Sequence, residues 1–257
     1  MLAYLLKSSD LASLVGFVSG DFFKVVPVGD LASLGAQLRR NAGDADGFAA
    51  ARADLDARLE AGGLSVRLAR PSGGDARAGA SRETTAGAAL DLFFFQVLAG
   101  ETWLLDFRAA SFSAADANSV SWAPKALWWS PSEEFRRGVR ELYTGFYGGD
   151  DARFVRALAA LGLSAAEAPL RAHFGLGDQR AVRFELANFQ ATFASVFRAC
   201  RVAGTSIPPE FAVLGLMLLT LYEHLEALGG TFDVRASFER AHVAARRSAS
   251  RGREALS

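Results

Sequence analysis

The stretch LDLFFFQVLAGETWLLDFR, residues 90–108, decides the fold that the sequence predicts. Two apolar segments, 90–98 and 102–107, flank the short turn-like stretch 99–101, which contains a glycine. Apolar segments joined by a three-residue turn with glycine are typical of a β-hairpin. Three consecutive phenylalanines, residues 93–95, favour burial on both faces. The sequence therefore predicts a hairpin near the middle of the chain.

Upstream of this hairpin, short strands and helices alternate. Residues 64–68 alternate apolar and polar side chains, which indicates a half-buried strand, and residues 22–26 form a second strand-like run that ends at Pro27. Residues 44–61 are typical of an exposed helix. Between 71 and 87 the chain consists largely of Gly, Ala, Ser and Arg, which predicts a flexible loop or linker.

Downstream of the hairpin, the signals become helical. Ser130 is suited to an N-cap and Pro131 to the first helical position, and the acidic pair 133–134 would lie at the positive end of the helix dipole. Glycines then separate the further predicted helices, which are 151–161, 165–174, 188–203, 208–228 and 235–247.

These patterns predict an α+β protein. We expect a small, mostly antiparallel sheet in the first 110 residues or so and a predominantly helical C-terminal half. The expected units are an N-terminal α/β segment at 1–70, the linker at 71–87, a hairpin plus helical domain at 88–240, and a basic tail at 241–257. Residues 1–240 could equally form one continuous domain.

Composition narrows the classes of function. The 257 residues carry 28 basic and 28 acidic side chains, so no chain-wide positive field would collect nucleic acid. Cys200 is the only cysteine, which excludes an internal disulfide and fits a reducing compartment. No signal-peptide pattern opens the chain. We therefore expect a cytoplasmic protein that does not bind nucleic acid.

The longest apolar run, residues 211–222, predicts a buried core helix. It has 12 residues between two glutamates, whereas a bilayer-spanning helix needs about 20. No transmembrane segment is expected. The Arg-rich stretch 235–257, with six Arg and two Glu, could make a weak contact with an anionic membrane surface.

Familiar catalytic signatures are absent from the sequence. It contains no G-x-x-x-x-G-K-[ST], G-x-G-x-x-G, G-x-S-x-G or H-E-x-x-H pattern. The only histidines, at 173, 224 and 242, fall in three different predicted helices. Most metal and triad sites therefore lack the residues they need.

The segment Trp103-Leu104-Leu105-Asp106-Phe107 places an aspartate at the end of an apolar strand, where kinases hold a metal-binding carboxylate. With the stretches 130–137, 142–151 and 207–221, this segment resembles the C-lobe of the UbiB-type atypical kinases over about residues 90–235. The resemblance implies a C-lobe-like scaffold in which Asp106 would bind magnesium beside ATP. Asp91 and Gln96 keep the five-residue spacing of the Asp and Asn in that family's catalytic loop.

The sequence also departs from that family. Arg108 stands where the family has glycine, the phenylalanines at 93–95 replace its His-Pro-Gly, and its K-x-G-Q helix and Ala-rich nucleotide loop are missing. We therefore expect a non-catalytic, pseudokinase-like scaffold without a cofactor that works through an unknown protein partner. One alternative is a degenerate ATPase or kinase with magnesium on Asp106 and Asp91 and Gln96 as catalytic candidates. A further alternative is a peripheral membrane-associated protein.

Overall fold

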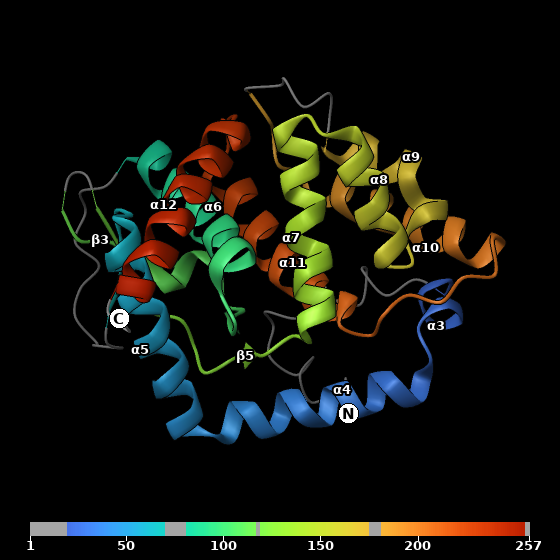
Figure 1. Ribbon diagram of the computed structural model, residues 1–257, viewed down its shortest axis with the longest axis horizontal. Coiled ribbons are helices and arrows are strands. Elements are labelled where there is room, and N and C mark those ends of the chain that lie inside the picture. Colours follow the sequence, from blue (N-terminus) through green and yellow to red (C-terminus); the bar gives the residue numbers. More distant parts are fainter. Residues whose placement is uncertain (1–19, 70–80, 117–118, 175–180, 255–257) are drawn as a thin grey trace.

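The computed structural model describes residues 20–69, 81–116, 119–174 and 181–254. Its fold is α+β with a helical majority, as predicted (Figure 1). The helices are α3 (Phe22–Val25), α4 (Val28–Gly43), α5 (Ala45–Gly62), α6 (Arg82–Ala99), α7 (Glu133–Gly148), α8 (Asp151–Ala160), α9 (Glu167–Phe174), α10 (Leu186–Val202), α11 (Phe211–Leu228) and α12 (Val234–Glu254), with short 3₁₀ turns at Ala109–Ser111 and Ser164–Ala166.

The strands form two small sheets beside the helices. Strand β4 (Val120–Trp122) pairs in parallel with β1 (Val66–Leu68) and antiparallel with β3 (Phe112–Ala114). Strand β2 (Trp103–Leu104) pairs antiparallel with β5 (Trp128–Trp129). The pairing is mostly antiparallel, as expected, but the strands extend beyond residue 110.

The hairpin predicted at 90–107 is wrong in its first half, which is the C-terminal part of helix α6. Ser81 caps this helix by accepting a hydrogen bond from the Thr84 N–H at 3.1 Å. Twelve of its residues are buried, so the helix is apolar on nearly all sides and shows no helical periodicity. The chain then leaves Gly100 and enters β2, so only the second predicted segment contains a strand.

Two other predictions near the N-terminal half also need correction. Residues 22–25 form the short helix α3, not a strand, and Phe22 packs edge-on against Phe197 at 5.0 Å. The predicted linker 71–87 overlaps α6, which begins at Arg82, while residues 70–80 lie outside the described part of the chain. The strand predicted at 64–68 is confirmed as β1.

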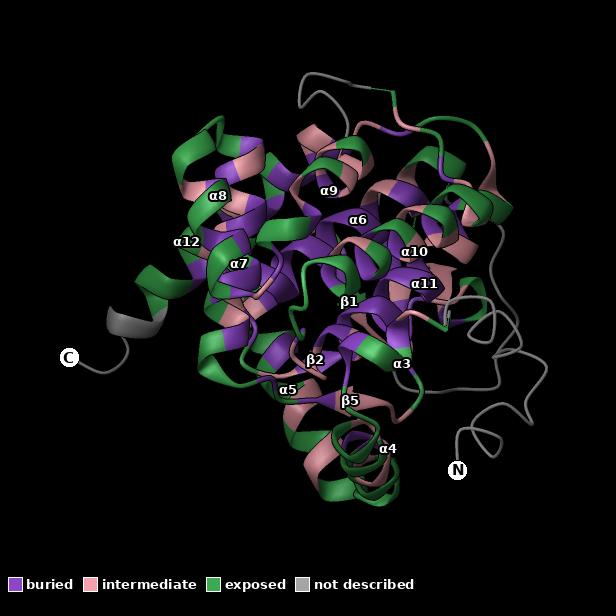
Figure 2. Cartoon of the chain, turned by 90° about the vertical axis from the view of Figure 1, so that its right-hand side faces the viewer, coloured by how far each residue is buried: buried purple, intermediate pink, exposed green. Residues whose placement is uncertain are grey.

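Helices α6 and α11 form the centre of the core (Figure 2). Helix α11 covers the apolar run predicted as a core helix, and 12 of its 18 residues are buried. By length and composition it is also the one helix in the described part of the chain that could cross a membrane, although 67% of that span is buried inside the protein. Phe93, Phe94 and Phe95, which belong to α6, are at most 2% exposed.

The predicted tail at 241–257 is part of a long helix as far as residue 254. Helix α12 packs against α6 and α5, and it buries Ala241, Ala244 and Ser248. Small side chains at these positions allow close approach of the neighbouring helices. The arginines at 246, 247 and 251 remain exposed on the outer side of α12.

Candidate functional site

Asp106, predicted as a metal ligand, lies two residues after β2 and is 1% exposed. One carboxylate oxygen, Oδ1, accepts a hydrogen bond from the Arg108 Nε at 2.6 Å. The other, Oδ2, accepts from the Ser111 hydroxyl at 2.6 Å and from the Lys125 backbone N–H at 2.9 Å. Both oxygens are therefore bound by groups of the protein itself.

These contacts favour an ionised carboxylate. Burial opposes ionisation, but the hydrogen bonds from Arg108, Lys125 and Ser111 outweigh it, and the pKa of Asp106 lies below its ordinary value. A magnesium ion prefers near-octahedral oxygen ligands and usually keeps several waters, which requires open space beside the carboxylate. Here a cation and two donors already occupy the carboxylate, so the arrangement does not fit a magnesium site.

Arg108 stands where the resembled kinases have glycine, and its backbone conformation does not require glycine. Arg108 has φ −62° and ψ 148°, an extended conformation that every L-residue adopts easily. The chain turns into the 3₁₀ segment that begins at Ala109, so the Arg108 side chain folds back onto Asp106. Arginine at this position therefore supplies the counter-ion of the carboxylate.

Gln96, one of the two catalytic candidates, fastens α6 to β2. Its side-chain amide donates to the Leu104 carbonyl at 3.2 Å, and its Oε1 accepts from the Leu104 N–H at 2.7 Å. Its own backbone carbonyl accepts from the Trp103 indole at 3.1 Å. Gln96 is fully buried. Its side-chain amide pairs with the Leu104 backbone as a neighbouring strand would.

Asp91, the other candidate, fastens α6 to α12. Its two oxygens accept hydrogen bonds from the Arg240 Nη2 at 2.8 Å and Nε at 2.9 Å, a bidentate pair. Burial raises the pKa of Asp91, and Arg240 only partly offsets this effect. The same hydrogen bonds raise the pKa of Arg240, and the fork geometry is that of an ionised carboxylate.

Breaking the Asp91 pair should have a moderate effect on stability. In Asp91→Ala the guanidinium of Arg240 stays hydrated because 51% of its side chain is exposed. We expect the free energy of unfolding to fall by about 1–3 kcal/mol in urea denaturation. Glu239→Ala, which breaks an exposed pair with Arg235 on the same helix, should change it by less than about 1 kcal/mol. Equal losses in the two variants would contradict a structural role for Asp91.

The structure does not bring the three predicted site residues to one point. Asp91 and Gln96 lie five residues apart on a continuous helix, which places them about 140° apart around its axis at 100° per residue. In a catalytic loop the same spacing could converge on one ion. Within the described ranges, no group of three or more His, Cys, Asp or Glu is arranged to hold a metal ion.

Several residues that complete the Asp106 site were not predicted. Thr220 on α11 accepts from the Phe107 N–H at 3.3 Å and donates to the Leu105 carbonyl at 3.1 Å, within the segment that holds Asp106. His224, one turn later, is 2% exposed, and burial lowers its pKa to about 4. The late apolar helix therefore supports the segment that holds Asp106 through the hydroxyl of Thr220.

Comparisons with family models, with curated proteins and with solved structures found no match to this chain.

Proposed function

We propose that the chain is a non-catalytic, pseudokinase-like scaffold that works in the cytoplasm by binding a partner protein. The observation that supports this proposal most strongly is the environment of Asp106. A metal-binding aspartate must offer an oxygen to the ion, whereas both oxygens here are bound by Arg108, Ser111 and the Lys125 N–H. Asp91 and Gln96 are engaged in the same way by other structural partners.

Helix α4 supports the second half of the proposal because it is an exposed arm of the molecule. Asn41 and Trp128 exchange two hydrogen bonds, of 3.1 and 2.9 Å, which fix the arm to β5 at its C-terminal end. At the other end, the Val25 carbonyl accepts from the Ile207 N–H at 3.0 Å. Of the 16 residues of α4, only Leu34 and Leu38 are buried.

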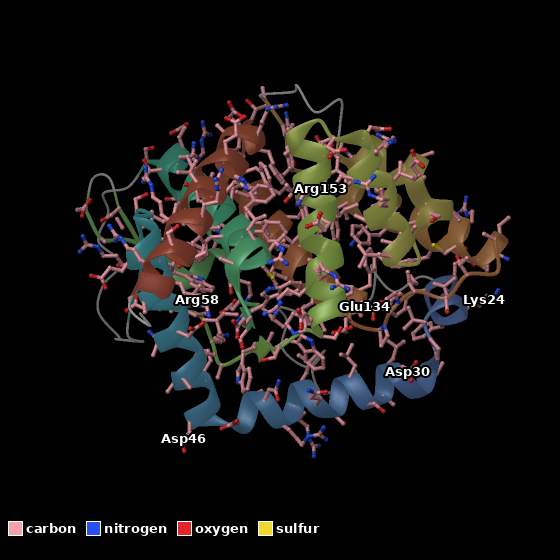
Figure 3. All side chains as sticks on the ribbon, viewed as in Figure 1. Lys24, Asp30, Asp46, Arg58, Glu134 and Arg153 are labelled. Atoms are coloured by element: carbon pink, nitrogen blue, oxygen red, sulfur yellow. The ribbon has the colours of Figure 1, made fainter. Side chains whose placement is uncertain are left out.

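The figures show how this arm is placed. It crosses below the helical body in Figure 1 and is largely exposed in Figure 2. In Figure 3, Asp30 lies near one end of the arm and Asp46 at the corner where the arm meets α5. An arm fixed at both ends and exposed between them offers a pre-ordered helical surface, which lowers the entropic cost of binding a partner.

A thermal-shift titration with ATP and magnesium tests the non-catalytic half. An ATP site filled at 100 times its Kd would stabilise the fold by about 2.7 kcal/mol, which corresponds to a rise in Tm of roughly 5–10 °C for a chain of this size. We expect a change of less than about 1 °C, equal to that with magnesium alone. A larger rise that is lost in Asp106→Asn would overturn the proposal in favour of an ATP-binding protein.

A further inference from the structure

A surface groove of about 220 Å³ lies between helices α7 and α8. One face of each helix forms it, because the lining residues of each helix follow the spacing i, i+3, i+4 and i+7. The lining residues are Glu134, Arg137, Gly138 and Glu141 on α7 and Arg153, Arg156, Ala157 and Ala160 on α8. Three arginines therefore line one groove.

The two helices form a closely packed antiparallel hairpin. A Cβ at Gly145 would lie 2.6 Å from the Phe154 backbone nitrogen, and a Cβ at Gly138 would lie 2.7 Å from the Leu161 Cδ2. Gly138 and Ala157 are buried beneath the groove. Their small size leaves open space between the longer charged side chains on either side.

Arg137 and Arg156 carry charges that the described part of the protein does not neutralise. Both residues are exposed, and neither makes an ion pair with a described residue. They come from the middle of the two lining faces, one from each helix. Like charges in one groove repel each other, and water weakens this repulsion without removing it. An anion between the two helices would remove it.

The third arginine of the groove is already paired. Arg153 donates to the Glu141 Oε1 from Nη2 at 2.9 Å and to Oε2 from Nε. Hydrogen bonding from Arg153 is the main cause that lowers the pKa of Glu141, and the charges of Arg140 and Arg156 add to the shift. Glu141 is thus occupied, and Arg156 lies near enough to act on it without contact.

Glu134 is the remaining carboxylate of the lining. Figure 3 shows Glu134 near the lower end of α7 and Arg153 beside the upper half of that helix, so these residues mark opposite ends of the groove. Because the Arg153–Glu141 pair is neutral, Arg137 and Arg156 contribute two positive charges against one negative charge from Glu134. The centre of the groove is therefore suited to an anion.

The pair of guanidinium groups suits a phosphate group in particular. Each guanidinium is planar and can donate two parallel hydrogen bonds to phosphate oxygens. A phosphorylated side chain carries a charge of about −1.5 to −2 near pH 7, which matches two arginines, whereas a carboxylate carries only one negative charge. Clusters of arginine are a recurring means of recognising phosphorylated segments.

We propose that the α7–α8 groove binds the phosphate group of a phosphorylated side chain in the partner protein. Arg137 and Arg156 would bind the phosphate oxygens from the two sides of the groove, above Gly138 and Ala157. This proposal rests on the proposed partner-binding function, but it depends on neither α4 nor Asp106. Its failure would therefore leave the evidence for a non-catalytic scaffold unchanged.

Calorimetric titration of the full chain with matched probes tests the assignment. The probes are inorganic phosphate and the capped peptide Gly-Gly-Ser-Gly-Gly, with the serine phosphorylated or unmodified. We expect saturable binding of the phosphopeptide, at least about 10-fold tighter than that of the unmodified peptide. Absence of saturable phosphopeptide binding would overturn the proposal. Affinity for inorganic phosphate equal to that for the phosphopeptide would assign the groove to the free ion instead of a partner segment.

Substitutions in the groove locate the binding. Arg137→Gln/Arg156→Gln should weaken phosphopeptide binding by about 10-fold or more, while the melting temperature stays within about 2 °C because both residues are exposed and make no ion pair with a described residue. Arg39→Gln/Arg40→Gln, which removes two exposed arginines of α4, is the matched control and should leave the affinity unchanged. Equal affinities in the two double variants would overturn the assignment.

Glu134→Gln provides a test with the opposite sign. Removing this negative charge should tighten phosphopeptide binding by about 2-fold at low salt. The same substitution should have no effect in the Arg137→Gln/Arg156→Gln background, because the anion is then no longer held in the groove. Tighter binding in both backgrounds would show that the phosphopeptide binds elsewhere through the overall charge of the protein.

Discussion

Asp106→Ala should lower the free energy of unfolding by about 3–5 kcal/mol, the loss expected when one partner of a buried ion pair is removed. The substitution leaves Arg108, of which only 23% of the side chain is exposed, without its counter-ion. It also removes the acceptor of the buried Ser111 hydroxyl and of the Lys125 N–H. Urea denaturation followed by circular dichroism measures the loss.

Two companion variants separate this role from a metal-binding one. Asp106→Ala combined with Arg108→Ala should lose clearly less than the sum of the two single changes, because each single change already breaks the pair. Asp46→Ala, at the exposed corner labelled in Figure 3, should change stability by less than about 0.5 kcal/mol. A loss in Asp106→Ala no larger than in Asp46→Ala would show that the carboxylate does not hold the strand end.

Much of the helical half could be predicted because its signals are local. Glycines and capping residues mark the helix ends, as at Asp150, whose carboxylate accepts from the Arg153 N–H at 2.9 Å at the start of α8. The N-cap of α7 is Ser132, which lies two residues after the predicted Ser130. Local chemistry of this kind acts within one turn, so the chain segment alone contains it.

The central segment could not be predicted in the same way. Residues 90–98 are buried on nearly every side, and a run without polar positions has neither a helical nor a strand period. The glycine interpreted as a hairpin turn instead ends α6, where a Cβ at Gly100 would lie 2.6 Å from the Gln96 carbonyl oxygen. The choice between helix and strand was made by packing against α12 and α11, which come more than 100 residues later.

The candidate site, too, could be predicted only where its signals are local. The strand-end position of Asp106 was visible in the sequence, as was the nearby Arg108. The partners that complete its environment, Ser111, Lys125 and Thr220, come from a 3₁₀ turn, a loop and a distant helix, and no spacing rule links them to the strand. The sequence therefore identifies polar residues at positions that match the resembled kinase lobe. Which elements of the fold these residues join depends on tertiary contacts.

Acidification from pH 7.5 to pH 5 should destabilise the fold by about 2 kcal/mol for each of His173 and His224, or about 4 kcal/mol together. Burial lowers the pKa of each histidine to about 4 in the folded protein, against about 6.5 in the unfolded chain. Between these values the unfolded chain binds protons that the folded protein does not. Stability is thus complete above pH 6.5 and declines as the pH falls toward 4.

The slope of unfolding free energy against pH, from urea denaturation at several pH values, provides the measurement. His173→Gln and His224→Gln should each remove about half of the slope, whatever their effect on stability at pH 7.5. His242→Gln is the matched control, because His242 lies on the outer part of α12, is only partly buried and should contribute little. If all three variants and the parent gave parallel curves, His173 and His224 would not be held neutral in the folded protein.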